Sequence, residues 1–140
     1  MIRCLLHDSF YKYTKTCKRK WWKDFGVNRY STRDTENYNL FYEFWEGRRF
    51  LGAMYGTNFY EGSNEIYLDH LFVNEKYERK GYGTYMIDYL KKKYKYIYVE
   101  SIDEAVGFYR KLGFTKNRDQ SHRIYDTTID MTLTIKKKRK

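Results

Sequence analysis

The chain has 140 residues and a net charge of +10, with 41% hydrophobic and 21% aromatic residues. This length suits one compact domain with its own hydrophobic core, and this composition excludes a disordered protein. No apolar run approaches the roughly 20 residues of a membrane span and no signal peptide follows Met1, so we expect a cytoplasmic protein that does not enter the membrane. Cys4 and Cys17 match no zinc-binding spacing, which predicts reduced thiols and no metal.

The first forty residues combine a short strand with a basic and aromatic segment. The strand is predicted over 2–6, and an amphipathic helix over 8–23, where apolar residues recur at spacings of three and four. Lysines and an arginine surround Trp21 and Trp22 in this helix. Such a cluster favours either nucleic-acid binding or an ordinary helix with buried tryptophans and solvated lysines. A loop or a short second helix is predicted over 28–39.

Strands dominate the next part of the chain. Residues 40–45 and 50–60 form a predicted hairpin whose turn lies near Gly47. A further strand is predicted over 65–73, and its second half is strongly apolar.

A pair of glycines separates this strand from the helix that follows. A loop over 74–80 ends in Gly81 and Gly83, and the helix extends to about Tyr94. Glycines let backbone N–H groups approach a ligand closely at the positive end of a helix, which makes an anion site suited to a pyrophosphate. A tight turn explains the glycines equally well when they are considered alone.

The C-terminal third alternates strand, helix and strand. A short strand is predicted over 96–100. Ser101 and Glu104 have the spacing of a capping box that opens a helix, and Gly113 is placed to end it. A last strand is predicted over 124–135, with clear alternation of apolar and polar residues in its second half.

The order of these elements predicts a mixed α/β sheet in one domain over 1–135. Residues 136–140 are all basic, and we expect them to form a disordered tail. This tail resembles a nuclear localisation signal, which predicts nuclear import if the host is eukaryotic or viral. The basic surface favours a polyanionic partner, such as nucleic acid or a phosphate-rich cofactor, or is simply solvated.

Two segments carry a family resemblance. The first is Leu68-Asp69-His70-Leu71-Phe72-Val73 with the glycine loop after it, and the second is Ala105-Val106-Gly107-Phe108-Tyr109-Arg110-Lys111-Leu112-Gly113-Phe114. Together they resemble the GNAT superfamily of acyl-CoA-dependent N-acyltransferases, where an apolar strand leads to a Q/R-x-x-G-x-G/A loop and a later helix carries A-x-x-F-Y-x-x-x-G-F. The resemblance covers about a third of the chain strongly and leaves 1–40 nearly unmatched. It implies a GNAT fold, with a mixed central sheet and helices on both faces, and acetyl-CoA as the donor substrate.

The resemblance also assigns roles to residues. It implies that the backbone near the end of the apolar strand binds the acetyl carbonyl and the pantetheine arm, and that the loop backbone holds the pyrophosphate. Tyr109 would protonate the leaving thiolate as a general acid, although its spacing also suits a core aromatic. The implied cofactor-binding residues are Leu71, Phe72, Val73, Arg79, Lys80, Gly81, Tyr82, Gly83 and Thr84.

Two positions depart from the family pattern. Glu78 stands where the family has Gln or Arg, so a carboxylate lies close to the expected pyrophosphate, and Arg79 is expected to supply the charge instead. Ile102 stands where the family often has Asn. The lysines over 91–95 suit the negative end of a helix, and a contact with the 3′-phosphate of coenzyme A is the alternative.

The general base has several candidates. Strict alternation along the strand would place Glu65, Tyr67 and Asp69 on one face and His70 on the other. Asp69 and Glu65 are therefore the candidate bases, His70 is a candidate proton relay, and an ordered water would serve equally well.

The sequence thus predicts transfer of an acetyl group from acetyl-CoA to a primary amine by direct attack, without a covalent intermediate. The acceptor is either a small molecule or a protein amine. The alternative is a catalytically weak GNAT-fold module that binds nucleic acid, which Glu78 in the phosphate loop favours. The resemblance also admits a homodimer.

Overall fold

The computed structural model describes residues 1–7, 40–58, 64–123 and 125–136, with only the backbone of His7, Asp69 and His70. The strands are β1 (Ile2–His7), β2 (Leu40–Glu46), β3 (Arg49–Thr57), β4 (Glu65–Val73), β5 (Tyr96–Ser101), β6 (Thr115–Lys116) and β7 (Ile129–Thr134). The helices are α4 (Tyr82–Lys91) and α5 (Val106–Lys111), and the 3-10 turns are η1 (Glu75–Tyr77) and η2 (Asp103–Ala105). The expected helix over 8–23, the segment 28–39 and the tail beyond Lys136 lie outside the described residues.

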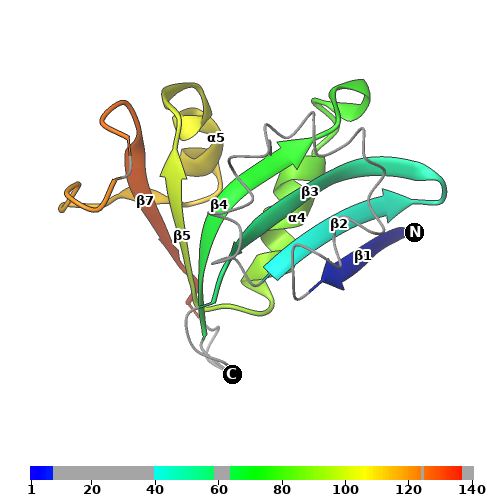
Figure 1. Ribbon diagram of the computed structural model, residues 1–140, viewed down its shortest axis with the longest axis horizontal. Helices are drawn as coiled ribbons and strands as arrows, with labels where there is room; N and C mark the ends of the chain where they lie inside the picture. Colours follow the sequence, from blue (N-terminus) through cyan, green and yellow to red (C-terminus); the bar gives the residue numbers. More distant parts are fainter. Residues whose placement is uncertain (8–39, 59–63, 124, 137–140) are drawn as a thin grey trace.

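All seven strands form one sheet in the order β1-β2-β3-β4-β5-β7-β6 (Figure 1). Strands β1 to β4 are an antiparallel meander, β4 and β5 are parallel, and β5, β7 and β6 are antiparallel again. A parallel pair needs a crossover connection, and α4 supplies it between β4 and β5. The mixed α/β sheet predicted from the order of elements is therefore confirmed.

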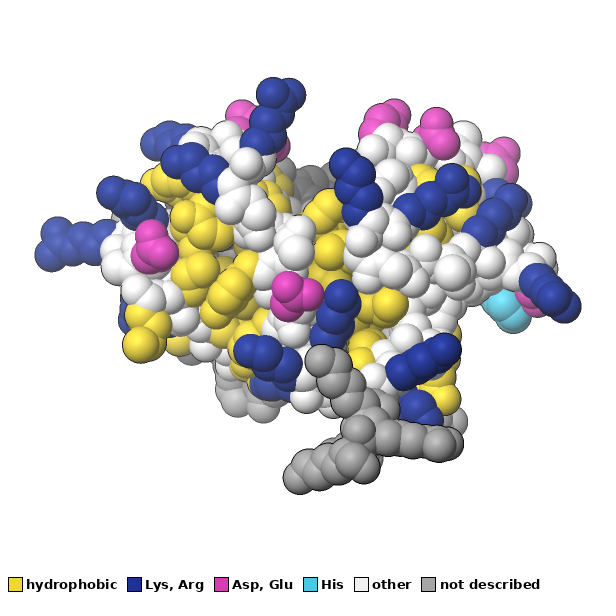
Figure 2. Space-filling view, turned by 180° about the vertical axis from the view of Figure 1, so that it is seen from behind, with side chains coloured by type: hydrophobic (Ala, Val, Ile, Leu, Met, Phe, Trp, Pro, Cys, Tyr) yellow, Lys and Arg dark blue, Asp and Glu magenta, His cyan; other side chains and the backbone are white. Residues whose placement is uncertain are grey.

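One face of the sheet carries the main hydrophobic cluster, and both α4 and α5 pack on it. The inner face of α4 is Met86, Ile87 and Leu90, all fully buried, as the 3.6-residue pattern predicts. Alternate residues of β4, β5 and β7 face these helices, and Figure 2 shows the helix-covered side of the molecule. The packing fixes α4 across the parallel pair, so its N-terminus lies at the end of the sheet where β4 and β5 finish.

A β-bulge interrupts β4. Tyr55 of β3 pairs with His70 and the next residue of β3 pairs with Leu68, so Asp69 is the extra residue. Leu68 and Leu71 consequently both join the core although they are three positions apart. Strict alternation over 65–70 is therefore wrong from Asp69 onward.

Other predicted boundaries also differ from the structure. Ser101 is not a helix cap, because it is the last residue of β5, pairs with Ile129 and donates its hydroxyl to the Ile102 carbonyl at 2.8 Å. The chain then forms η2, and α5 begins after Ala105 without a side-chain cap. Helix α4 ends at Lys91 and β7 starts only at Ile129. Strand β6, which has two residues, was not predicted.

Candidate active site

The parallel strands β4 and β5 separate toward their carboxyl ends. Their pairing covers only Glu65 to Leu68 against Tyr96 to Val99, whereas β4 continues to Val73 and β5 to Ser101. Figure 1 shows the two strands diverging beyond this point. On its other side β4 stays paired with β3 as far as Val73. In the described part of the chain, the β5-facing backbone groups of β4 beyond Leu68 have no strand partner, so an extended amide-containing ligand can pair there.

The loop after β4 is anchored by a buried asparagine. The side-chain amide of Asn74 donates to the Phe50 carbonyl at 2.9 Å, and its backbone N–H donates to the Leu51 carbonyl at 2.8 Å. Its side-chain oxygen also accepts the Lys76 N–H and caps η1. Asn74 therefore fixes the start of the glycine loop against the neighbouring strand, a role that the sequence analysis missed.

The glycine loop contains two residues in the left-handed region. Arg79 has a φ of 63° and Gly81 has a φ of 83°. A non-glycine residue rarely adopts this conformation, and such strain gathers at functional sites. A Cβ built on Gly81 would meet no heavy atom within 4 Å, so the space in front of this residue is open.

The N-terminus of α4 has the properties of an anion site. Gly81 is its N-cap and supplies no side-chain hydrogen bond, and no acidic residue lies in the first turn. The N–H groups of Tyr82, Gly83 and Thr84 precede the first helical bond, which Tyr85 donates to the Gly81 carbonyl at 3.0 Å. Together with the positive end of the helix dipole, these groups suit a phosphate or a pyrophosphate.

Gly83 serves packing as well. A Cβ at this position would lie 3.1 Å from the ring of Phe108 and 3.6 Å from Val73. The missing side chain therefore lets the first turn of α4 approach both α5 and the end of β4.

Glu78, the residue that departs from the family pattern, is exposed at the end of η1 in an extended conformation. Arg79 and Lys80 follow it and are also exposed, and the amine of Lys80 lies 5.9 Å from the ring of Tyr77. Solvent screening weakens the repulsion between an exposed carboxylate and a bound phosphate.

Tyr109 lies in α5 and is only 8% exposed. Its ring makes edge contacts with Phe108 and Phe114. Burial raises the pKa of Tyr109 to about 12, so the phenol stays protonated at neutral pH and can donate a hydrogen bond. The sequence interpretation of Tyr109 as a core aromatic is thus supported, and its catalytic role stays a prediction.

An acidic pocket of about 290 Å³ opens along β4, β5 and β7. Its lining residues are Glu65, Ile66, Tyr67, Tyr98, Val99, Asn117, His122, Asp130 and Met131. The hydroxyl of Tyr98 donates to Glu65 Oε2 at 3.0 Å across the parallel pair. The pocket therefore adjoins the point where β4 and β5 separate, since Leu68 and Val99 are the last residues that pair.

Asp130 is the most buried carboxyl of this pocket, with 5% exposure. Its Oδ1 has no hydrogen-bond partner among the described residues. Burial, and then the nearby Glu100 carboxylate, raise the pKa of Asp130. Glu100 itself accepts hydrogen bonds from the Thr128 hydroxyl at 2.6 Å and the Tyr125 N–H at 3.1 Å. An ammonium group is the natural partner for a buried, incompletely satisfied carboxyl.

Comparison with known proteins agrees with this geometry. The acetyltransferase (GNAT) domain family matches residues 11–135 of the chain. The chain belongs to the GNAT acetyltransferase family. No curated protein sequence matches it.

Solved GNAT structures share the fold at low sequence identity. An acetyltransferase of the GNAT family from Staphylococcus aureus Mu50 superposes with a TM-score of 0.69 at 18% identity, covering 97% of this chain and 100% of that one. A GNAT acetyltransferase from Elizabethkingia anophelis with acetyl-CoA bound has a TM-score of 0.67 at 15% identity, covering 95% and 97%. A Bacillus subtilis acetyltransferase in complex with CoA has a TM-score of 0.65 at 15% identity, covering 96% and 99%.

Within this GNAT fold the two candidate bases occupy different positions. Asp69 directly follows the last pair between β4 and β5, and its side chain lies outside the described part of the structure. Glu65 lies three residues before Leu68, the last residue of β4 that pairs with β5, and is therefore roughly 10 Å from the opening at about 3.3 Å per residue. Glu65 would therefore need a water molecule to reach a reacting amine. Asp130 was missed by the sequence analysis, although a carboxyl among the alternating apolar residues of a strand was the available signal.

The lysines over 91–95 lie at the C-terminal end of α4. The glycine loop is at the other end of this helix, about 15 Å away for ten residues. The predicted contact between these lysines and the 3′-phosphate of coenzyme A is therefore not supported. Among the described residues there is no cluster that could hold a metal ion, and no described helix is long and apolar enough to cross a membrane.

Proposed function

We propose that this GNAT protein transfers an acetyl group from acetyl-CoA to a primary amine by direct attack. The observation that supports this most is the opening between β4 and β5, which lies beside the open glycine loop and the uncapped N-terminus of α4. An extended pantetheine arm would pair with the free backbone edge at Leu71 and Val73. The pyrophosphate would then bind the N–H groups from Arg79 to Thr84.

In the reaction, the lone pair of a neutral amine forms a bond to the thioester carbonyl carbon, and the carbon–sulfur bond then breaks. Backbone N–H groups of β4 would stabilise the negative charge that develops on the carbonyl oxygen. The amine proton would leave through Asp69, or through water toward Glu65. The leaving thiolate takes up a proton that balances the one released by the amine, so the products are an acetylated amine and the thiol of coenzyme A.

Tyr109 would act on the leaving sulfur chiefly as a hydrogen-bond donor. A phenol with a pKa of about 12 is a weaker acid than a thiol with a pKa near ~8.5, so complete proton transfer to the thiolate is uphill. A hydrogen bond from the phenol still stabilises the thiolate as the carbon–sulfur bond breaks, and the low polarity of the site strengthens it.

The acidic pocket supports a small, positively charged acceptor. Its volume of about 290 Å³ is at the lower end of the range for small-molecule sites. Glu65 and Asp130 would hold a second ammonium group of a diamine or polyamine while the reacting amine lies at the opening. A lysine side chain of a protein is the alternative acceptor.

Calorimetric titration with acetyl-CoA tests the proposal. Gly81→Glu places a carboxylate in the open space before α4 and should weaken binding by at least tenfold, or about 1.4 kcal/mol. Gly47→Glu is the matched control, because Gly47 also has a positive φ of 60° and open surroundings but lies in the β2–β3 turn. Absence of acetyl-CoA binding by the unmodified protein, or equal loss in both variants, would overturn the proposal.

A further inference from the structure

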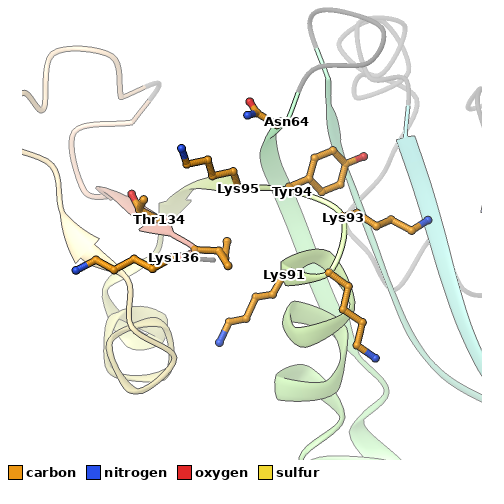
Figure 3. Close-up of a pocket in the computed structure, with 9 residues that line it drawn as sticks. Asn64, Lys91, Lys93, Tyr94, Lys95, Thr134 and Lys136 are labelled. Carbon is orange, nitrogen blue, oxygen red and sulfur yellow. The ribbon is translucent and has the colours of Figure 1, made fainter. Parts of the chain in front are cut away.

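A basic groove lies at the end of the sheet opposite the glycine loop. It has a volume of about 720 Å³ and forms where the end of α4, the start of β5 and the end of β7 meet (Figure 3). Its lining residues are Asn64, Lys91, Lys92, Lys93, Tyr94, Lys95, Thr134, Ile135 and Lys136. Five of these are lysines and none is acidic.

Backbone hydrogen bonds join the chain segments that surround the groove. The Asn64 carbonyl accepts the N–H groups of Lys95 and Tyr96 at 2.7 and 3.2 Å, and the Lys95 carbonyl accepts the Ile135 N–H at 2.8 Å. Segments far apart in the sequence are therefore held side by side. Figure 3 shows Lys91, Lys93, Lys95 and Lys136 fanning out from this junction.

The lysines of the groove differ in what they contact. Lys91 lies 3.4 Å from Asp88 and donates to the Leu112 carbonyl, and the amine of Lys93 lies 4.8 Å from the Tyr89 ring. Lys92, Lys95 and Lys136 are exposed, although the amine of Lys95 lies 5.3 Å from the ring of Tyr96. These three ammonium groups can bind an anion without breaking an ion pair to a described carboxylate.

We propose that this groove binds single-stranded nucleic acid through its phosphate backbone. A concave surface that carries charge of one sign concentrates a polyanion, and the half-buried Tyr94 adds an aromatic ring to the lining of this groove. Lysines act as point charges on phosphates and do not form the bidentate pairs by which arginine recognises bases, so the binding is independent of sequence.

This site is independent of the acetyl-CoA site, because α4 separates the two by about 15 Å. Nucleic acid would therefore bind while the opening between β4 and β5 is occupied. Figure 2 shows several dark-blue lysine and arginine side chains at this end of the molecule.

The test is fluorescence anisotropy with a labelled oligo-uridine of about 12 nucleotides, a length within the range of single-strand sites. The triple variant Lys92→Glu/Lys95→Glu/Lys136→Glu should bind at least tenfold more weakly at about 50 mM salt. For the unmodified protein, the logarithm of the binding constant should fall with the logarithm of the salt concentration with a slope of about −2, as expected for three phosphate contacts. The control Arg48→Glu/Lys111→Glu/Lys116→Glu makes the same charge change at exposed positions outside the groove and should lose less than about threefold. Unchanged acetyl-CoA binding in both variants would show that they fold.

A second measurement locates the site directly. Oligo-uridine should protect Lys92, Lys95 and Lys136 from an amine-reactive reagent and leave Lys111 and Lys116 reactive, as detected by mass spectrometry. Absence of oligonucleotide binding, equal loss in the control variant, or protection confined to other lysines would overturn the proposal. So would binding to anionic lipid vesicles that depends on the same three lysines and is tighter than binding to the oligonucleotide.

Discussion

Tyr109 in α5 and Asp130 in β7 are 8% and 5% exposed, so each carries a buried ionisable group. Burial raises the pKa of both groups, but the consequences differ. A buried phenol at neutral pH keeps its neutral form and remains a hydrogen-bond donor. A buried carboxylate is destabilised by desolvation, and His122 and Arg123 offset this only in part at Asp130, because its pKa is still raised.

Replacing Tyr109 by Phe removes only the hydroxyl, and the ring contacts with Phe108 and Phe114 remain. We expect kcat to fall by about 10² because the thiolate loses its hydrogen-bond donor, while the Kd for acetyl-CoA changes less than about twofold. Steady-state kinetics and calorimetry on the same preparation measure the two quantities. Tyr125→Phe is the control at a 65% exposed tyrosine. An unchanged kcat would assign Tyr109 to packing alone.

Asp130→Asn should stabilise the fold and impair the acceptor site. Because burial raises the folded-state pKa, the stability linked to this group is present below its unfolded value of 3.8 and is lost as pH rises through the folded value. At neutral pH the variant should therefore be more stable than the unmodified protein in urea unfolding. The KM for a diamine acceptor should rise about tenfold, or about 1.4 kcal/mol.

Asp126→Asn removes an exposed carboxyl from the preceding turn and serves as the control. A gain of stability for Asp130→Asn that persists below pH 3.8 would show that its origin is not the buried charge. An unchanged KM for diamines would remove Asp130 from the acceptor site.

At the scale of elements, α5 is a helix of six residues with one glycine inside it and one just beyond its end. Gly113 has a φ of 100°, and a Cβ there would lie 3.3 Å from Leu133 Cδ1. A Cβ on Gly107 would meet no heavy atom within 4 Å. Gly113→Ala should therefore cost at least about 1 kcal/mol, whereas Gly107→Ala should gain roughly 0.5 kcal/mol. Thermal unfolding of the two variants should shift in opposite directions, and shifts of the same sign would contradict this account of the helix end.

The elements that the sequence predicts well are those with long apolar periodicity, such as the core face of α4 and the limits of β4. The β4 bulge was not predicted, because Leu71, Phe72 and Val73 are all apolar and hide the change of phase that Asp69 introduces. The capping box at Ser101 failed because strand pairing with Ile129 competes for the same residue. Strand β6 is too short to produce any periodicity.

At the scale of the whole molecule, a site can be proposed from the sequence only when its residues lie in one continuous segment. The glycine loop and Tyr109 could be proposed from the sequence because each lies in one continuous segment, and their roles stay predictions. The acidic pocket takes residues from β4, β5 and β7, and the basic groove from the end of α4, the start of β5 and the end of β7. No local pattern joins such residues, so only the three-dimensional fold reveals that a protein with a net charge of +10 separates a basic groove from an acidic pocket.

Alkaline pH should destabilise the whole fold through its buried tyrosines. Burial raises the pKa of Tyr109 from 10.0 to about 12 and also raises that of Tyr42. Above pH 10 the unfolded chain therefore binds fewer protons than the folded chain, and the unfolding free energy falls as pH rises. Tyr109 alone accounts for up to about 3 kcal/mol of this fall. Urea unfolding across this pH range should show that the unfolding free energy of Tyr109→Phe falls less, by that amount, whereas that of Tyr125→Phe falls as much as that of the unmodified protein. Parallel curves for all three proteins would mean that the Tyr109 phenol ionises as freely in the folded protein as in the unfolded chain.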